Sequence, residues 1–243
     1  MSPSIASHRG HDMRQTSRRA LADAAQTVRR ADLAIAYCCI VTALTIVLNV
    51  IDTEDKQRII DETSSNLANL RDHPVQSLVA SAFVVPRPAG LVQVAMLLVV
   101  LAYAQRFIGR AASLVVGLSG HIGATIVVAT ALESGIFHHF VDPSVRTASD
   151  VGVSYVLACA MGFLTLFVPG RWCWAWSAGL AIYWLLPGAF ERSFTDAGHA
   201  AALSIGWLMA FVCWRAIALS APPTQKGPDS RPGPSDAGTP DRI

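Results

Sequence analysis

The feature that most constrains this chain is a series of six apolar runs with the approximate length of membrane spans. They are Asp32–Ile51, Ala89–Gln105, Ala111–Leu132, Val151–Val168, Trp172–Phe190 and Ala197–Leu219. A transmembrane helix needs about 20 mainly apolar residues. Only 15% of the 243 residues are charged, well below the roughly 25% of a soluble domain. A soluble helical bundle would also show polar faces at helical period, which these runs mostly lack. The sequence therefore predicts an all-α polytopic membrane protein.

The basic residues predict how this bundle sits in the membrane. Thirteen of the 19 Lys and Arg residues lie in the N-terminal arm, in the turns after the second and fourth runs, and at or beyond the end of the sixth. Because basic loops stay on the cytoplasmic side, we expect an integral protein of the cell membrane with both termini cytoplasmic. The chain then divides into a basic cytoplasmic arm (1–31), a six-helix membrane domain (32–219) and a Pro- and Gly-rich cytoplasmic tail (220–243), which we expect to be disordered.

Two segments outside the runs also carry helical signals. Arg14–Arg30 is compatible with a basic helix at the membrane surface, although an anchor that enforces the orientation is the favoured interpretation. The first external loop, about 52–88, has apolar residues at roughly helical spacing from Leu67 to Phe83, interrupted by Pro74. We expect this loop to lie against or dip into the outer leaflet where protein covers it.

The composition argues against several classes of function. All five cysteines fall inside apolar runs without disulfide or zinc spacing, so buried packing is their expected role. The basic residues flank membrane spans, so no nucleic-acid partner is expected, and no metal or cofactor is implied. A transporter or channel is less favoured, because the runs carry little polar lining and no paired interrupted helices.

Polar side chains inside the runs are the candidate site residues, because they are costly within a bilayer. Three stand out: His121 in the third run, Ser154 in the fourth and His199 in the sixth. Each also has a structural interpretation, since a serine can bond the carbonyl one turn back and a histidine can bond a neighbouring helix. His121 lies mid-run beside glycines, and we interpret it as a packing and hydrogen-bonding residue.

Small residues favour a pairing of Ser154 with His199. They form the faces Ser154, Ala158 and Gly162 in the fourth run and Gly198, Ala202 and Gly206 in the sixth. Both runs cross in the same direction, and both polar residues lie roughly 5–8 Å below the outer boundary. Faces of this kind let membrane helices pack closely, and a histidine beside a serine can take its proton. Asp150 and Asp196 stand at helix entrances, where N-capping is expected, so the arrangement would be a dyad.

These motifs resemble those of the rhomboid family of intramembrane serine proteases. That family has a six-helix core, with the serine of a Gly-x-Ser-x motif opening the fourth helix and a histidine followed by small residues in the sixth. Here "GVSY" (Gly152–Tyr155) and "GHAAALSIG" (Gly198–Gly206) hold these places. The turn "YAQRFIGR" also resembles the family's connection after the second helix, with Gln105 where an acid is usual.

The resemblance covers about Asp32 to Leu219 and implies a rhomboid-like bundle of six transmembrane helices. It further implies a serine-type endopeptidase that cleaves the transmembrane segments of client membrane proteins, with Ser154 as nucleophile and His199 as base. Its partners would be those segments and the lipid bilayer.

Several departures from the family pattern support an alternative. The region "AGLVQVAM" lacks the histidine and asparagine that help bind the oxyanion in the family. Tyr155 replaces the glycine usual after the serine, Ala158 stands where an aromatic residue is usual, and the first external loop has no tryptophan. Loss of oxyanion donors costs on the order of 10²–10³ in rate. The alternative is a catalytically weak or inactive pseudoprotease that binds the transmembrane helices of partner proteins.

Overall fold

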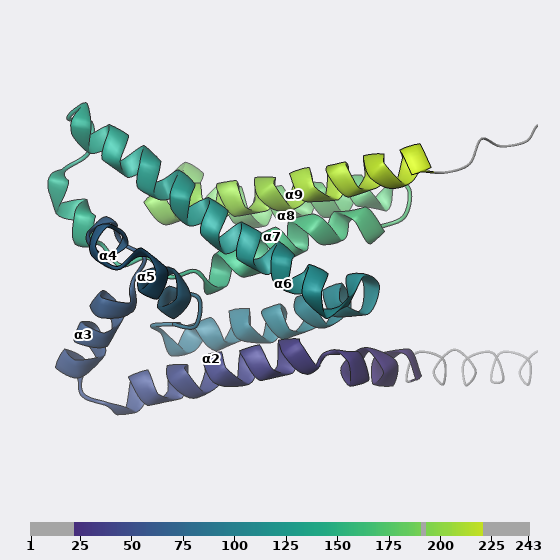
Figure 1. Cartoon of the computed structure of the whole chain (residues 1–243), viewed down its shortest axis with the longest axis horizontal. Helices are drawn as coiled ribbons and strands as arrows, with labels where there is room; N and C mark the ends of the chain where they lie inside the picture. The colour runs from purple at the N-terminus through teal and green to yellow at the C-terminus, as the bar shows by residue number, and fades with distance from the viewer. Residues whose placement is uncertain (1–21, 191–192, 221–243) are drawn as a thin grey trace, which may run out of the picture.

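The computed structural model describes residues 22–190 and 193–220, and none of these residues forms a strand (Figure 1). A short helical segment over 22–30 precedes the named elements. These are α2 (Asp32–Val50), α3 (Thr53–Thr63), α4 (Leu67–Asp72), α5 (Pro74–Ser81), η1 (Pro88–Gly90), α6 (Leu91–Phe137), η2 (Pro143–Thr147), α7 (Val153–Leu164), η3 (Thr165–Phe167), α8 (Trp172–Phe190) and α9 (Phe194–Ser220). The expected disordered tail and residues 14–21 of the expected basic helix lie outside the described residues. The all-α prediction is confirmed.

The second and third predicted spans form the two limbs of α6, which bends sharply between them (Figure 1). The bend is at Gly109, whose φ of 81° and ψ of 176° interrupt the helical backbone. A positive φ is costly for a residue with a Cβ atom, so glycine suits this position. The bend falls inside the "YAQRFIGR" segment that the sequence assigned to a turn.

Several of these helices are long and apolar enough to cross a membrane. By length and hydropathy they are α2, Pro88–Phe137 and α9, while Val153–Phe167 is apolar but shorter. The order and approximate bounds of the predicted runs therefore agree with the helices, but six separate spans are not each established. Within the short segment Val153–Phe167, the residues from Val153 to Phe163 are all buried.

The core is built around α7, which packs against both α6 and α9. Every residue from Val153 to Phe163 is buried. Glycines make close approaches between these helices. A Cβ atom at Gly120 of α6 would lie 2.1 Å from the Cβ of Cys159. A Cβ atom at Gly206 of α9 would lie 2.2 Å from the Cys159 carbonyl oxygen. A Cβ atom at Gly162 would lie 2.8 Å from the carbonyl oxygen of Leu203. Small residues thus set the spacing of the three helices.

The loop between α2 and α6, predicted to be external, folds into α3, α4 and α5 (Figure 1). Proline fixes the first turn of α5 at Pro74, the position that the sequence marked as an interruption. The Tyr37 hydroxyl of α2 donates to the Ala82 carbonyl at 2.5 Å, and the Tyr37 and Phe83 rings meet edge to face. One side of α5 faces protein, with Ser77 and Ser81 buried, while Val75 and Val79 are 73% and 58% exposed, so the expected position of this loop at the membrane stays a prediction.

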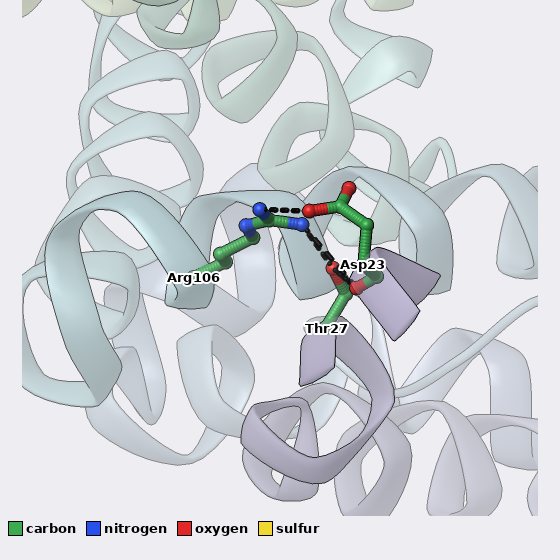
Figure 2. Close-up of polar contacts among 3 residues, drawn as sticks. All are labelled: Asp23, Thr27 and Arg106. Atoms are coloured by element: carbon green, nitrogen blue, oxygen red, sulfur yellow. Dashed lines mark hydrogen bonds and ion pairs between the residues drawn. The ribbon is translucent and has the colours of Figure 1, made fainter. Parts of the chain in front are cut away.

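At the opposite end of α2, polar side chains tie the helical segment 22–30 to the bend of α6. Figure 2 shows the Arg106 guanidinium, which pairs with the Asp23 carboxylate and donates to the Thr27 hydroxyl at 2.8 Å. This contact holds the pKa of Asp23 below its ordinary value. Buried Gln105 accepts from the Ala34 N–H at 2.7 Å and donates to Asp32 at 3.3 Å. A carboxylate in place of Gln105 would lack the N–H donor for Asp32.

Candidate functional site

The candidate site lies where α7 and α9 begin, and the register of these two helices follows from the contacts of three glycines. Gly198 faces Tyr155, since a Cβ atom there would lie 2.2 Å from the tyrosine oxygen. Further along, Gly206 faces the Cys159 backbone and Gly162 faces the Leu203 backbone. The helices therefore run in the same direction, and the first turns of both lie at the same level.

Ser154 is the second residue of α7, and it is buried with 9% of its surface exposed. Among the hydrogen bonds of the described residues, none involves its hydroxyl. The carbonyl one turn back, that of Asp150, accepts instead from the Ser64 and Ser65 hydroxyls at 3.1 and 3.2 Å. The serine therefore does not make the structural bond that its position in an apolar helix suggested.

His199 lies between two aromatic rings. The Tyr155 ring of α7 meets the imidazole at a centroid distance of 5.5 Å and an interplanar angle of 74°, and the Trp184 ring of α8 lies 4.6 Å away. The Nε2 atom of His199 is buried and has no hydrogen-bond partner. The structure thus brings Ser154 and His199 to the same level of two contacting helices without a hydrogen bond between them, and their catalytic roles stay predictions.

Tyr155 is fixed by a buried carboxylate. Its ring is fully buried against Gly198, and its hydroxyl donates to Asp150 Oδ1 at 2.8 Å. Asp150 itself is 4% exposed, and its backbone N–H donates to the Ser64 hydroxyl at 2.7 Å. Burial raises the pKa of Asp150 to about 6. This network joins the loop between α2 and α6 to the start of α7 and holds Tyr155 beside the imidazole.

The two acids at the helix entrances have different roles. Asp196 forms a reciprocal cap with Ser193 at the start of α9: the serine N–H and hydroxyl donate to its carboxylate, and its own N–H donates back to the hydroxyl. This is the capping-box arrangement, with Asp196 in the first turn of α9 rather than at the N-cap position expected from the sequence. Asp150 does not cap α7, whose N-cap residue is Gly152 without a side-chain bond. The capping role expected for Asp150 was therefore wrong, because its carboxylate instead accepts from Tyr155.

His121 has the structural role that the sequence favoured. It is 1% exposed, and its Nε2 lies 2.8 Å from the Leu78 carbonyl of α5. Its ring lies so close to Gly152 that a Cβ atom there would be 1.9 Å from it. The Gly152 N–H in turn donates to the Ser81 carbonyl at 2.9 Å. The imidazole therefore joins α5 to the segment that leads into α7.

Sequence reasoning missed Asp150 and Trp184 as neighbours of the candidate pair. Asp150 stands five residues before Tyr155, and an acid beside an apolar run that carries a tyrosine is a weak signal for a buried pair. Trp184 is one of several tryptophans of α8, and its spacing does not distinguish the one that faces His199. Among the described residues, no group of three or more His, Cys, Asp or Glu side chains is placed to hold a metal ion.

The fold and these contacts define an all-helical membrane protein with a buried serine and a partly buried histidine on adjacent helices. The family model of the rhomboid-like proteins matches residues 26–217. This match covers most of the chain, and the protein therefore belongs to the rhomboid-like protein family. Searches of curated proteins and of solved structures gave no significant match.

Proposed function

We propose that this protein is a rhomboid-like pseudoprotease that binds the transmembrane segments of client membrane proteins without cleaving them efficiently. The observation that carries the proposal is the environment of His199. Its imidazole packs between Tyr155 and Trp184, and its buried Nε2 has no partner. A serine nucleophile needs its base within about 2.6–3.2 Å, and the Ser154 hydroxyl makes no such bond.

Tyr155 supports this interpretation because two contacts fix the position of its side chain. The Asp150 carboxylate accepts from its hydroxyl, and its ring fills the space above Gly198. The ring also packs edge to face on the imidazole, so a rotation of His199 would disturb this ring and its hydrogen bond to the buried carboxylate. An unpaired buried polar group costs about 1–3 kcal/mol, so the resting arrangement opposes formation of the dyad.

The outer face of α8 is the surface that we propose for client helices. The helix packs on α9 and carries two buried anchors, Leu180 and Trp184, at 3% exposure each. Its other face presents Ile182, Leu185 and Leu186. A client helix would replace lipid on this face, where association depends on packing rather than on the hydrophobic effect.

Photocrosslinking in lipid vesicles tests the binding proposal. A photoreactive residue at Ile182 should crosslink to a transmembrane client in Ser154→Ala protein as well as in wild type. The matched control is Leu208 of α9, which has nearly the same exposure, 62% against 61%. Equal crosslinking from both positions, or none from Ile182, would contradict a client site on α8.

A weak intramembrane serine protease is the second candidate, supported by the common level of Ser154 and His199 on adjacent helices. In that case Tyr155→Gly should raise proteolysis of a transmembrane substrate, because it opens the space beside both residues. Ser154→Ala and His199→Ala should each abolish the activity to a similar degree, since residues that act as one unit are not additive. Proteolysis that persists in Ser154→Ala would exclude this candidate.

A further inference from the structure

A groove on the other side of the bundle has no role in the site described above. It is a cavity of about 320 Å³ between α2, α5 and the second limb of α6. Leu33 and Ile40 of α2, Leu78 and Phe83 at α5, and Leu114 and Leu118 of α6 are among the residues that line it. The volume lies at the lower end of the roughly 300–1,000 Å³ typical of ligand pockets.

The groove offers almost nothing to water. Four of its lining side chains carry polar atoms, and each already makes a bond to the protein: Tyr37 to Ala82, Gln105 to Ala34, Ser113 to Gly109 and His121 to Leu78. The other ring nitrogen of His121, Nδ1, has no partner and lies against Gly152. A buried water molecule needs about two to four polar partners. The natural content of this groove is therefore apolar.

The groove also opens toward the surroundings of the bundle. Several lining residues are exposed, with 49% of Ile40, 48% of Leu114 and 43% of Leu118 accessible. A flexible hydrocarbon chain can therefore enter the groove from the side.

Positive charge surrounds one end of the groove. Arg110 pairs with Asp32 immediately before the lining residue Leu33, and its side chain is 70% exposed. Arg29 and Arg30 precede the same end of α2 and are exposed, and neither pairs with a carboxylate among the described residues. Clustered basic residues next to a membrane helix attract anionic lipid headgroups.

We propose that this groove is a binding site for one anionic glycerophospholipid. An acyl chain lies along α2 and the second limb of α6 beneath α5, and the phosphate lies near Arg29, Arg30 and Arg110. The lipid would contact α5 directly, so it would also brace the helix whose Ser81 carbonyl accepts from Gly152 ahead of Ser154.

Lipid retention by the purified full chain tests the site. Native mass spectrometry with added phosphatidylglycerol or phosphatidylcholine should show one retained phosphatidylglycerol, bound at least tenfold more tightly than phosphatidylcholine. Ala36→Trp places a large ring in the groove and should weaken this binding at least tenfold. Cys39→Trp is the matched control, because Cys39 is an exposed residue of the same helix outside the groove. It should bind the lipid as wild type does.

The charged end is tested separately. The double variant Arg29→Gln with Arg30→Gln should lose most of the preference for phosphatidylglycerol, whereas Arg171→Gln, an exposed arginine beyond α7, should keep it. Thermal unfolding of each variant in detergent without lipid checks that it is folded. Equal lipid binding by Ala36→Trp and Cys39→Trp would overturn the groove assignment. A preference unchanged by the double variant would overturn the headgroup assignment.

Discussion

The helices α7 and α8 are both strongly apolar, yet their surroundings are opposite. All of α7 from Val153 to Phe163 is buried by protein, although it contains a serine, a cysteine and a glycine. In α8, Trp174 is 77% exposed and Ile182 is 61% exposed, while Leu180 and Trp184 are buried. The difference lies in side-chain size: α7 and its neighbours meet through small residues, whereas the bulky α8 contacts protein along one side.

This comparison teaches that hydropathy alone does not separate the centre of a membrane bundle from its periphery. Close packing of backbones requires small residues at the contact, and α6, α7 and α9 supply them at Gly120, Gly162 and Gly206. The comparison of α7 with α8 also separates the candidate catalytic residue from the proposed client-binding surface. The central helix carries the candidate nucleophile in a rigid setting, and the peripheral helix offers the surface for a client.

The largest effect should come from filling the contact between α7 and α9. Gly206→Leu adds a side chain where even a Cβ atom would lie 2.2 Å from the Cys159 carbonyl oxygen. Overpacking typically costs about 1–3 kcal/mol, and we expect the upper end or loss of folding because backbone atoms cannot yield easily. The measurement is thermal unfolding in detergent, with yield of monodisperse protein as a second readout.

The matched control is Gly179→Leu in α8. No atom lies within 4 Å of a Cβ built at Gly179, so the same substitution should leave the midpoint of unfolding nearly unchanged. If both leucine variants were equally stable, the contrast between the two helices would be wrong.

A smaller effect on stability should follow from the pH dependence of the network that joins the loop between α2 and α6 to α7. Burial raises the pKa of Asp150 from 3.8 to about 6, so the folded protein holds this proton more tightly than the unfolded chain. The resulting stabilisation is complete below pH 3.8 and is lost as the pH rises through about 6. Between pH 7.5 and pH 5 it should grow by about 1 kcal/mol.

Asp150→Asn removes the titrating group and keeps an oxygen that accepts from Tyr155. As the pH falls from 7.5 to 5, the unfolding free energy of wild type should therefore rise relative to that of Asp150→Asn. A difference independent of pH over this interval would mean that Asp150 does not titrate as a buried group.

The smallest effect is expected on the exposed side of α8. Ile182→Ala removes apolar surface that faces outward, so the free energy of unfolding should change by less than about 0.5 kcal/mol. Client crosslinking, in contrast, should fall if this face binds client helices. A loss of stability as large as that caused by a core truncation, about 2–5 kcal/mol, would show that the residue is buried in the folded protein.

Much of this architecture could be predicted from the sequence. The apolar runs gave the helix order, Pro74 marked the start of α5, and the small residues of α7 and α9 indicated their close contact. These signals are local or periodic, so a single sequence contains them. The turn before Gly109 was also predictable, because charged residues and glycines interrupt the apolar pattern there.

The neighbours of the candidate pair could not be predicted in the same way. Ser154 and Tyr155 are adjacent residues about 100° apart on a helix, and spacing alone does not decide which one faces Gly198. The buried Asp150 bonds to Ser64 and Ser65 of the loop between α2 and α6, and such long-range pairing leaves no periodic pattern in the sequence. The contact of Arg106 with Asp23 is likewise set by the bend of α6.

The central claim is that His199 does not activate Ser154 in the resting protein. A fluorescent fluorophosphonate, which reacts with activated serines, tests it most directly on purified protein in lipid vesicles. The account predicts that wild type is labelled no more than Ser154→Ala, and that Tyr155→Gly gains at most weak labelling. Strong labelling of wild type that disappears in both Ser154→Ala and His199→Ala would contradict the claim and establish a working dyad.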